Sequence, residues 1–150
     1  MSLKAVRTLA IAALLALMQQ AIAGAEKTIK AIPDNLSGQP VVITQCTAVM
    51  ADDKKTGDAD AVFTPTTHLQ NNSSQNVVAL RLRFQLFNAF DDHLSDRNGI
   101  YDKMLGSGLD ATPYWQFAGF AESPINYTRC IVLNVRFENG QTWTRPTSGV

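Results

Sequence analysis

The stretch that decides the fold is Val78-Ala79-Leu80-Arg81-Leu82-Arg83-Phe84-Gln85-Leu86, in which large apolar side chains alternate with small or polar ones. A period of two is that of a β-strand with one buried face, because successive side chains of a strand point to opposite faces of its sheet. A helix would place Arg81 and Arg83 on either side of the apolar stripe and break it. We therefore predict a strand that ends at Phe90, with Arg81, Arg83 and Gln85 on its exposed face.

Several earlier segments are also typical of strands. Residues 41–49 are rich in β-branched side chains, which pack well on a pleated surface. Residues 62–70 form a further candidate, in which Pro65 has no N–H for the ladder and limits part of the segment to an edge or a bulge. A short run over residues 26–32 precedes them and ends at Pro33.

The end of the sequence predicts a β-hairpin. Asn139-Gly140 lies between the β-prone runs 127–137 and 142–144. Asn-Gly favours a type I′ turn, in which both central residues have positive φ. We therefore expect these two runs to pair as antiparallel neighbours.

Two polar segments separate the predicted strands. Residues 51–60 are rich in Asp, Lys and Gly, which is typical of a solvated loop. Residues 91–123 are rich in Gly and Asp and contain scattered aromatic side chains. Because long connections without structure are uncommon in compact domains, we expect one or two short strands there, around residues 113–120.

The first 25 residues have the pattern of a secretory signal peptide. A basic segment precedes the apolar run of residues 9–18, and small residues follow it. Cleavage is predicted after Ala23 or after Ala25. Residues 26–150 are then a single exported domain, located in the periplasm or secreted.

The charge balance excludes several classes of protein. The chain has 13 Lys and Arg against 13 Asp and Glu, and removal of Lys4 and Arg7 with the signal peptide leaves 11 basic residues against 13 acidic ones. A weakly acidic domain does not suit a nucleic-acid binder that works through a basic face. The apolar run at residues 77–90 is short and carries arginines, so we do not expect an integral membrane protein.

The cysteine content agrees with export. Cys46 and Cys130 are the two cysteines, and an even number in an oxidising compartment predicts one disulfide. Two buried thiols are the alternative. Alternate residues from Ile131 to Phe137 would share one buried face, which leaves Cys130 in the opposite register. Either a bulge intervenes or the disulfide lies off the main core.

Together these elements predict an all-β protein, namely an antiparallel β-sandwich that is Ig-like in architecture. The likeness to immunoglobulin domains is limited to architecture, because Trp115 lies close to Cys130 and far from Cys46 in the sequence.

Three stretches resemble the FxLYD-type and related exported bacterial β-sandwich domains. They are Leu69-Gln70-Asn71-Asn72-Ser73, residues 82–90 and residues 135–143. The pattern of that group has Tyr-Asp or Phe-Asp after the apolar strand, where this chain has Phe87-Asn88. The resemblance implies a fold and an extracytoplasmic location, and it supplies no catalytic residues.

The most enzyme-like or metal-like segment is Asp91–Asp102. A calcium loop of the EF-hand type with Gly99 in sixth place would begin at Leu94 and end at Leu105, and neither side chain has an oxygen. The loop at residues 52–60 does not match a calcium loop either, because Phe63 is at the position where a bidentate Glu is required. His68 and His93 are too far apart in the sequence to have metal-ligand spacing. We predict no metal, no cofactor and no catalytic residue, with an enzyme or metal site around Asp91–Asp102 as the less favoured alternative.

Two sets of residues are candidates for binding. Arg81 and Arg83 project from one strand face and form donors suited to carboxylates, although such arginines also occur on ordinary solvated faces. Tyr114 and Trp115 belong to an aromatic segment that either binds a sugar or peptide or plugs one end of the core. The sequence therefore favours a non-enzymatic binding module with an unknown protein or glycan partner.

Overall fold

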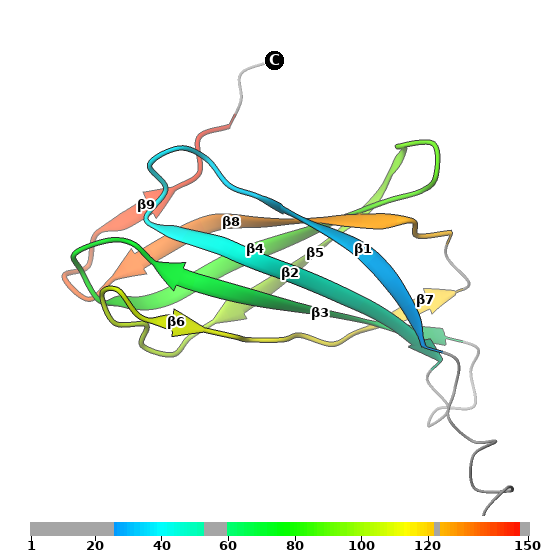
Figure 1. The fold of residues 1–150 in the computed structure, drawn as a ribbon, viewed down its shortest axis with the longest axis horizontal. Coiled ribbons are helices and arrows are strands. Elements are labelled where there is room, and N and C mark those ends of the chain that lie inside the picture. The colour runs from blue at the N-terminus through cyan, green and yellow to red at the C-terminus, as the bar shows by residue number, and fades with distance from the viewer. Residues whose placement is uncertain (1–25, 53–59, 122–123, 148–150) are drawn as a thin grey trace, which may run out of the picture.

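The computed structural model describes residues 26–52, 60–121 and 124–147, so the predicted signal peptide and the loop residues 53–59 lie outside the described part. The described residues form strands and turns without a helix, which confirms the all-β prediction (Figure 1). The strands are β1 (Lys27–Asp34), β2 (Val41–Asp52), β3 (Asp60–Asn71), β4 (Val77–Phe87), β5 (His93–Tyr101), β6 (Asp110–Ala111), β7 (Phe117–Ala121), β8 (Tyr127–Phe137) and β9 (Thr142–Thr144).

The strands join in the order β5-β4-β8-β1-β2-β3-β6, with β7 beside β3 and β9 beside β8. The expectation of a purely antiparallel sheet is wrong at one pairing. The first residues of β1, Lys27 to Ile29, are antiparallel to β2, whereas Lys30 to Asp34 are parallel to β8. No hairpin joins β1 to β8, so no turn fixes their relative direction, and β1 passes obliquely between the two neighbours (Figure 1).

The sheet folds over so that its two halves face each other. Three strands separate β3 from β4 in the strand order, yet the Phe63 and Phe84 rings have centroids 6.4 Å apart. Cys46 in β2 and Cys130 in β8 form a disulfide across β1, with a Cα–Cα distance of 6.6 Å. Apolar side chains from both halves therefore share one core.

Strand β4 has the predicted alternation. Leu80, Leu82, Phe84 and Leu86 are buried, whereas Arg81 is exposed. The first buried valine is Val77 rather than Val78, because the register with β8 shifts between Val77 and Ala79. The strand also ends at Phe87 rather than at Phe90, because a turn begins at Asn88.

A bulge in β8 resolves the register of Cys130. Leu82 pairs with Val132 and Arg81 pairs with Asn134, so Leu133 has no opposite residue. Cys130 and Val132 face inward before the bulge, and Val135 faces inward after it. The extra residue therefore places the disulfide in the main core.

Strand β5 is the largest element that the sequence did not predict. We expected a polar loop over residues 91–102, and the structure has a nine-residue strand, His93–Tyr101, paired with β4 along its length. The sequence of β5 contains Asp96, Asn98 and Gly99, which are disfavoured in strands. The ladder to β4 overrides this local preference. The short strands expected around residues 113–120 correspond to β7, with β6 earlier in the segment.

Pro65, which we expected to limit part of its strand to an edge or a bulge, lies in β3 opposite Ala48 of β2. β6 pairs with Leu69 and Gln70, and β7 pairs with residues 60–63, so Pro65 lies between them. Its carbonyl oxygen accepts a bond of 3.1 Å from the Trp115 N–H, although it has no N–H of its own to donate.

The predicted hairpin forms between β8 and β9 with a different turn. Gly140 has φ +87°, but the φ of Asn139 is not positive, so the turn is not type I′. Phe137 pairs with Gln141, and the Gly140 N–H donates to the Phe137 carbonyl at 3.0 Å. This is the pattern of a three-residue loop with a glycine bulge.

Three further strand boundaries differ from the sequence prediction. β1 continues through Pro33, which lies opposite Cys130 in the parallel ladder. β2 continues to Asp52 and β3 begins at Asp60, so the loop between them is shorter than the predicted loop of residues 51–60.

Candidate functional site

Two grooves meet at Ile100 near the end of edge strand β5. The arginine groove, of about 330 Å³, is lined by residues of β4, β5, β8 and β9, namely Ala79, Arg81, Ile100, Asn134, Arg136 and Thr142. The aromatic groove, of about 410 Å³, is lined by residues after β4, which include Ile100, Asp102, Lys103, Thr112, Tyr114 and Trp115. The Ile100 side chain is 63% exposed and belongs to both.

Strand pairing places the residues of the arginine groove next to one another. Ile100 in β5 lies opposite Arg81 in β4, which lies opposite Asn134 in β8. In the next row, Ala79 lies opposite Arg136. Because cross-strand partners share a face, these side chains line one outer face of the sheet. Ala79 is small, which leaves a hollow between larger neighbours.

The predicted pair Arg81 and Arg83 divides into two different environments. Arg83 Nε lies 3.3 Å from Asp96 Oδ2, so this guanidinium has an acidic neighbour within the protein. Arg81 is exposed and lines the arginine groove, and no acidic side chain of the described residues lies within ion-pair distance of it. Arg136 joins Arg81 at this groove and was missed from the sequence. Its position follows from the β8 bulge, which no local pattern signals.

The aromatic segment contains both buried and exposed rings. Phe120 is buried, and Phe117 packs against the core beside Phe63. Tyr114 is 65% exposed at the mouth of the aromatic groove. Both readings of the segment therefore apply, each to different rings.

Trp115 forms a fixed wall of the aromatic groove. Its ring packs on Phe84, with centroids 5.3 Å apart, and its Nε1 donates to the Ile100 carbonyl at 3.1 Å. The ring also covers Gly99 so closely that a Cβ there would lie 2.6 Å from Trp115 Cε2. Gly99 therefore supplies the close approach that lets Trp115 join β5 to the segment before β7.

Side chains also occupy part of the free edge of β5. Trp115 binds the Ile100 carbonyl, and Arg97 Nη1 donates to the Asp96 carbonyl at 3.1 Å. An edge strand whose outward carbonyls already have donors is a poorer template for pairing with another strand. Side-chain contacts in the two grooves are therefore a better basis for recognition than strand addition.

The Asp91–Asp102 segment brings together fewer charged groups than a metal site needs. His93 Nε2 lies 2.6 Å from Asp96 Oδ1, and Asp96 also faces Arg83. No group of three or more His, Cys, Asp or Glu side chains suited to a metal occurs in the described part of the chain. Asn88 Oδ1 accepts from the N–H groups of Phe90 and Asp92, which fixes the turn before β5.

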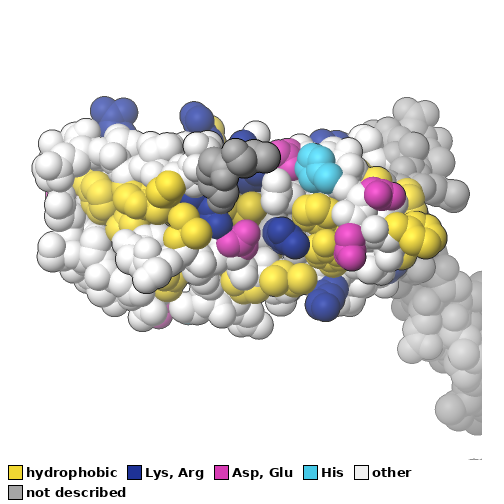
Figure 2. Space-filling view, turned by 90° about the horizontal axis from the view of Figure 1, so that it is seen from above, with side chains coloured by type: hydrophobic (Ala, Val, Ile, Leu, Met, Phe, Trp, Pro, Cys, Tyr) yellow, Lys and Arg dark blue, Asp and Glu magenta, His cyan; other side chains and the backbone are white. Residues whose placement is uncertain are grey.

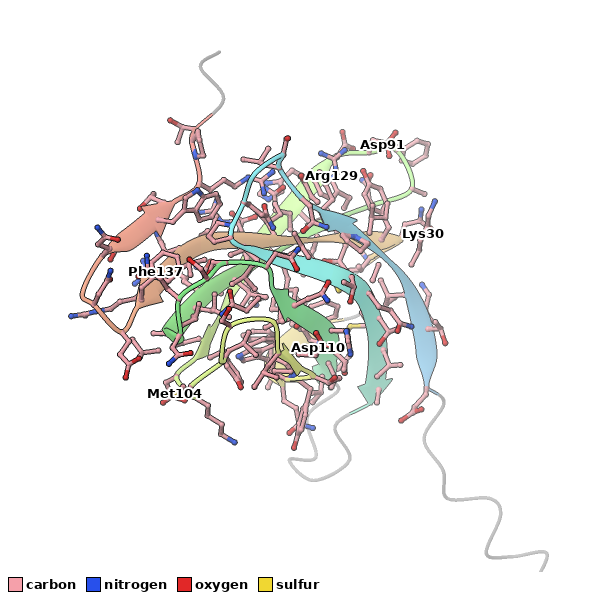
Figure 3. The ribbon with its side chains drawn as sticks, turned by 60° about the vertical axis from the view of Figure 1, so that its left-hand side comes forward. Lys30, Asp91, Met104, Asp110, Arg129 and Phe137 are labelled. Atoms are coloured by element: carbon pink, nitrogen blue, oxygen red, sulfur yellow. A yellow bond between two sulfur atoms is a disulfide. The ribbon has the colours of Figure 1, made fainter. Side chains whose placement is uncertain are left out.

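Tyr127 lies at the same end of the sheet, with its ring stacked on Phe87 at 4.8 Å between centroids. Burial raises the pKa of the Tyr127 phenol, and a hydrogen bond with Asp91 raises it further, while Arg129 opposes both. Figure 3 shows Asp91 and Arg129 together at this end. A tyrosine phenol is protonated at neutral pH even at its ordinary pKa, and the raised pKa favours the protonated form further, so the group is a hydrogen-bond donor there.

Most of the large hydrophobic side chains that are exposed among the described residues belong to one stretch of the sequence, residues 100–114. Met104, Leu109 and Tyr114 are, like Ile100, at least 60% exposed, and all follow within the segment 100–114. Phe90 is exposed at the opposite end of β5. The face in Figure 2 carries basic, acidic and hydrophobic side chains interspersed, without one broad field of a single sign.

No described helix is long and apolar enough to cross a membrane. No protein-family model matches the sequence, and no curated protein sequence matches it. The resemblance to FxLYD-type domains stays a prediction from the quoted residues.

Proposed function

We propose that this protein is an exported, non-enzymatic binding domain that acts in the periplasm or outside the cell. The signal-like residues 1–25 and the Cys46–Cys130 disulfide support export, because disulfides persist in oxidising compartments. Two facing halves of a sheet joined by a disulfide are typical of an Ig-like β-sandwich, an architecture that often carries binding surfaces. Binding by this domain would use the two grooves rather than the Asp91–Asp102 segment.

The observation that carries this proposal is the meeting of two grooves at an exposed isoleucine. Ile100 is 63% exposed and lines both grooves, and concave sites that combine apolar side chains with a few polar groups are the usual places for ligands to bind. Arg81 on one side and Tyr114 on the other are residue types that dominate binding energy at interfaces. The partner would therefore contact β5 and its neighbours around Ile100.

Export predicts a defined mature protein. Purified from the compartment in which it accumulates, the chain should begin at Gly24 or Glu26 and contain no free thiol. Intact-mass measurement with and without reduction and thiol alkylation checks both points. A chain that retains Met1 and two alkylatable thiols would contradict export.

The binding surface is tested by replacing Ile100 with Asp. The wild-type domain, immobilised, should capture a partner from an extract of exported proteins, and Ile100→Asp should reduce capture about tenfold or more, as for a central interface residue. Phe90→Ser is the matched control, since Phe90 is 84% exposed at the opposite end of β5. Capture by Ile100→Asp at the wild-type level, or equal loss in Phe90→Ser, would exclude this surface.

A glycan partner is the second candidate, favoured by the exposed ring of Tyr114 beside Asp102 and Lys103. Sugars present an apolar ring face and hydroxyl groups, which suit an aromatic side chain next to charged hydrogen-bonding groups. The same immobilised proteins, incubated with an oligosaccharide library, distinguish the candidates. Glycan retention that Tyr114→Ala abolishes would favour the glycan over a protein partner.

A further inference from the structure

Two arginines at the arginine groove lack acidic partners. Among the described residues, Arg83 pairs with Asp96 and Arg145 pairs with Asp34, whereas neither Arg81 nor Arg136 lies within ion-pair distance of a carboxylate. Both are exposed and lie diagonally opposite each other on β4 and β8. Neighbouring like charges on a sheet face are unfavourable, so an anion bound between them would be stabilised. Guanidinium groups suit carboxylates because they offer parallel N–H donors.

The same groove has an apolar side. Ile100 faces Arg81 across the β4–β5 ladder, and Ala79 leaves the hollow next to Arg136. The volume of about 330 Å³ is at the small end of the range for ligand sites. The groove therefore fits a group the size of a side chain and its backbone rather than a broad domain surface.

Asn134 adds a hydrogen-bond acceptor beside the two arginines, because it lies opposite Arg81 and two residues before Arg136 in β8. Its Nδ2 donates to Thr144 Oγ1 at 3.0 Å, while its Oδ1 has no hydrogen-bond partner among the described residues. A ligand that satisfies the groove would thus combine a carboxylate, an N–H donor and an apolar side chain. The last residue of a peptide has these three groups on one Cα.

We propose that the arginine groove binds the C-terminal carboxylate of a peptide or protein whose last residue is apolar. This assignment rests on the proposed binding function and names the ligand of its surface. Arg81 and Arg136 bind the carboxylate, Asn134 Oδ1 accepts the N–H of the last residue, and the side chain packs on Ile100 and over Ala79. A carboxylate on a Glu or Asp side chain offers the same charge, but its apolar neighbour lies on another residue.

The test uses short, fluorescently labelled peptides with an otherwise neutral sequence. One ends in Leu with a free carboxylate, a second is its C-terminal amide, and a third is an amide with one internal Glu. Fluorescence anisotropy should show binding of the free carboxylate about tenfold or more tighter than of either amide, as expected for a charge-assisted contact. If the Glu peptide binds as tightly as the peptide with the free C-terminal carboxylate, the groove recognises side-chain carboxylates, and the C-terminal assignment is overturned.

Protein variants locate the site. Arg81→Gln and Arg136→Gln should each weaken binding about tenfold, and Ala79→Phe should block the hollow without removing charge. Arg129→Gln is the matched control, because Arg129 is an exposed arginine of β8 that lies over the Phe87 ring, 5.2 Å from its centroid. Thermal unfolding of each variant verifies that it is folded. If Arg129→Gln weakens peptide binding as much as Arg81→Gln does, binding reflects general charge attraction, and the proposal is overturned.

Three further outcomes separate this proposal from the binding function itself. If capture of a partner depends on Ile100 but no carboxylate peptide binds, the ligand assignment fails and the surface stands. Tighter binding of an acidic oligosaccharide than of any peptide, lost in Arg81→Gln, would likewise overturn the peptide assignment. If Ile100→Asp leaves capture unchanged, the surface itself is wrong.

Discussion

Replacing Cys46 and Cys130 together by alanine should lower the free energy of unfolding by about 4 kcal/mol. The disulfide joins residues separated by 84 positions and therefore closes a long loop in the unfolded chain. In the chain-entropy account, the restriction of that loop destabilises the unfolded state. The bond also links β2 to β8 across β1, so it secures the strand that belongs to both halves of the sheet.

Thermal unfolding measures this effect. For a domain of this size, a loss of about 4 kcal/mol corresponds to a melting temperature roughly 15 °C lower. The wild-type protein with a reductant should melt near the double alanine variant, which controls for the packing change at the two sites. A difference of less than about 1 kcal/mol between the oxidised wild type and the variant would contradict the expected loop effect.

The elements that the sequence predicts well are those with a strong local pattern. β4 alternates residue by residue, β2 is rich in β-branched side chains, and Asn139-Gly140 marks a hairpin. In each case the pattern reports one buried face or a turn that nearby residues determine. The type of the hairpin turn was wrong because a glycine bulge satisfies the same two residues with one positive φ.

The elements that the sequence missed depend on contacts far along the chain. β5 contains residues disfavoured in strands and is held by β4 and by Trp115 over Gly99. The parallel pairing of β1 with β8 joins residues far apart in the sequence, such as Lys30 and Tyr127, and no local turn signal predicts it. Long-range pairing of this kind overrides local preference and is invisible in a single window of sequence.

The candidate site shows the same division. Arg81 could be placed on an exposed strand face from the alternation alone. Arg136 and Ile100 could not, because their neighbours are set by the β8 bulge and by the unpredicted strand β5. Arg83 has the same pattern as Arg81, but a diagonal contact with Asp96 gives it a partner. Register, rather than residue type, decides which arginine is available to a ligand.

Phe63→Ala should destabilise the domain by about 4 kcal/mol, as is typical of removing a fully buried phenylalanine. Phe63 in β3 is 0% exposed, and its ring centroid lies 6.4 Å from that of Phe84, 6.3 Å from Phe117 and 6.0 Å from Phe120. These rings come from strands at both ends of the sheet order. Truncation would therefore leave a cavity where the two halves meet.

Urea unfolding of matched variants tests this packing. Phe63→Leu keeps most of the volume and should cost less than Phe63→Ala, and Phe90→Ala should change stability by less than about 0.5 kcal/mol, since Phe90 is 84% exposed. A loss of less than about 1 kcal/mol in Phe63→Ala would mean that the ring does not fill a closed core. A large loss confined to Phe63→Ala would show that this aromatic cluster holds the two halves of the sheet together, and Phe84, which also packs against Trp115, belongs to the same cluster.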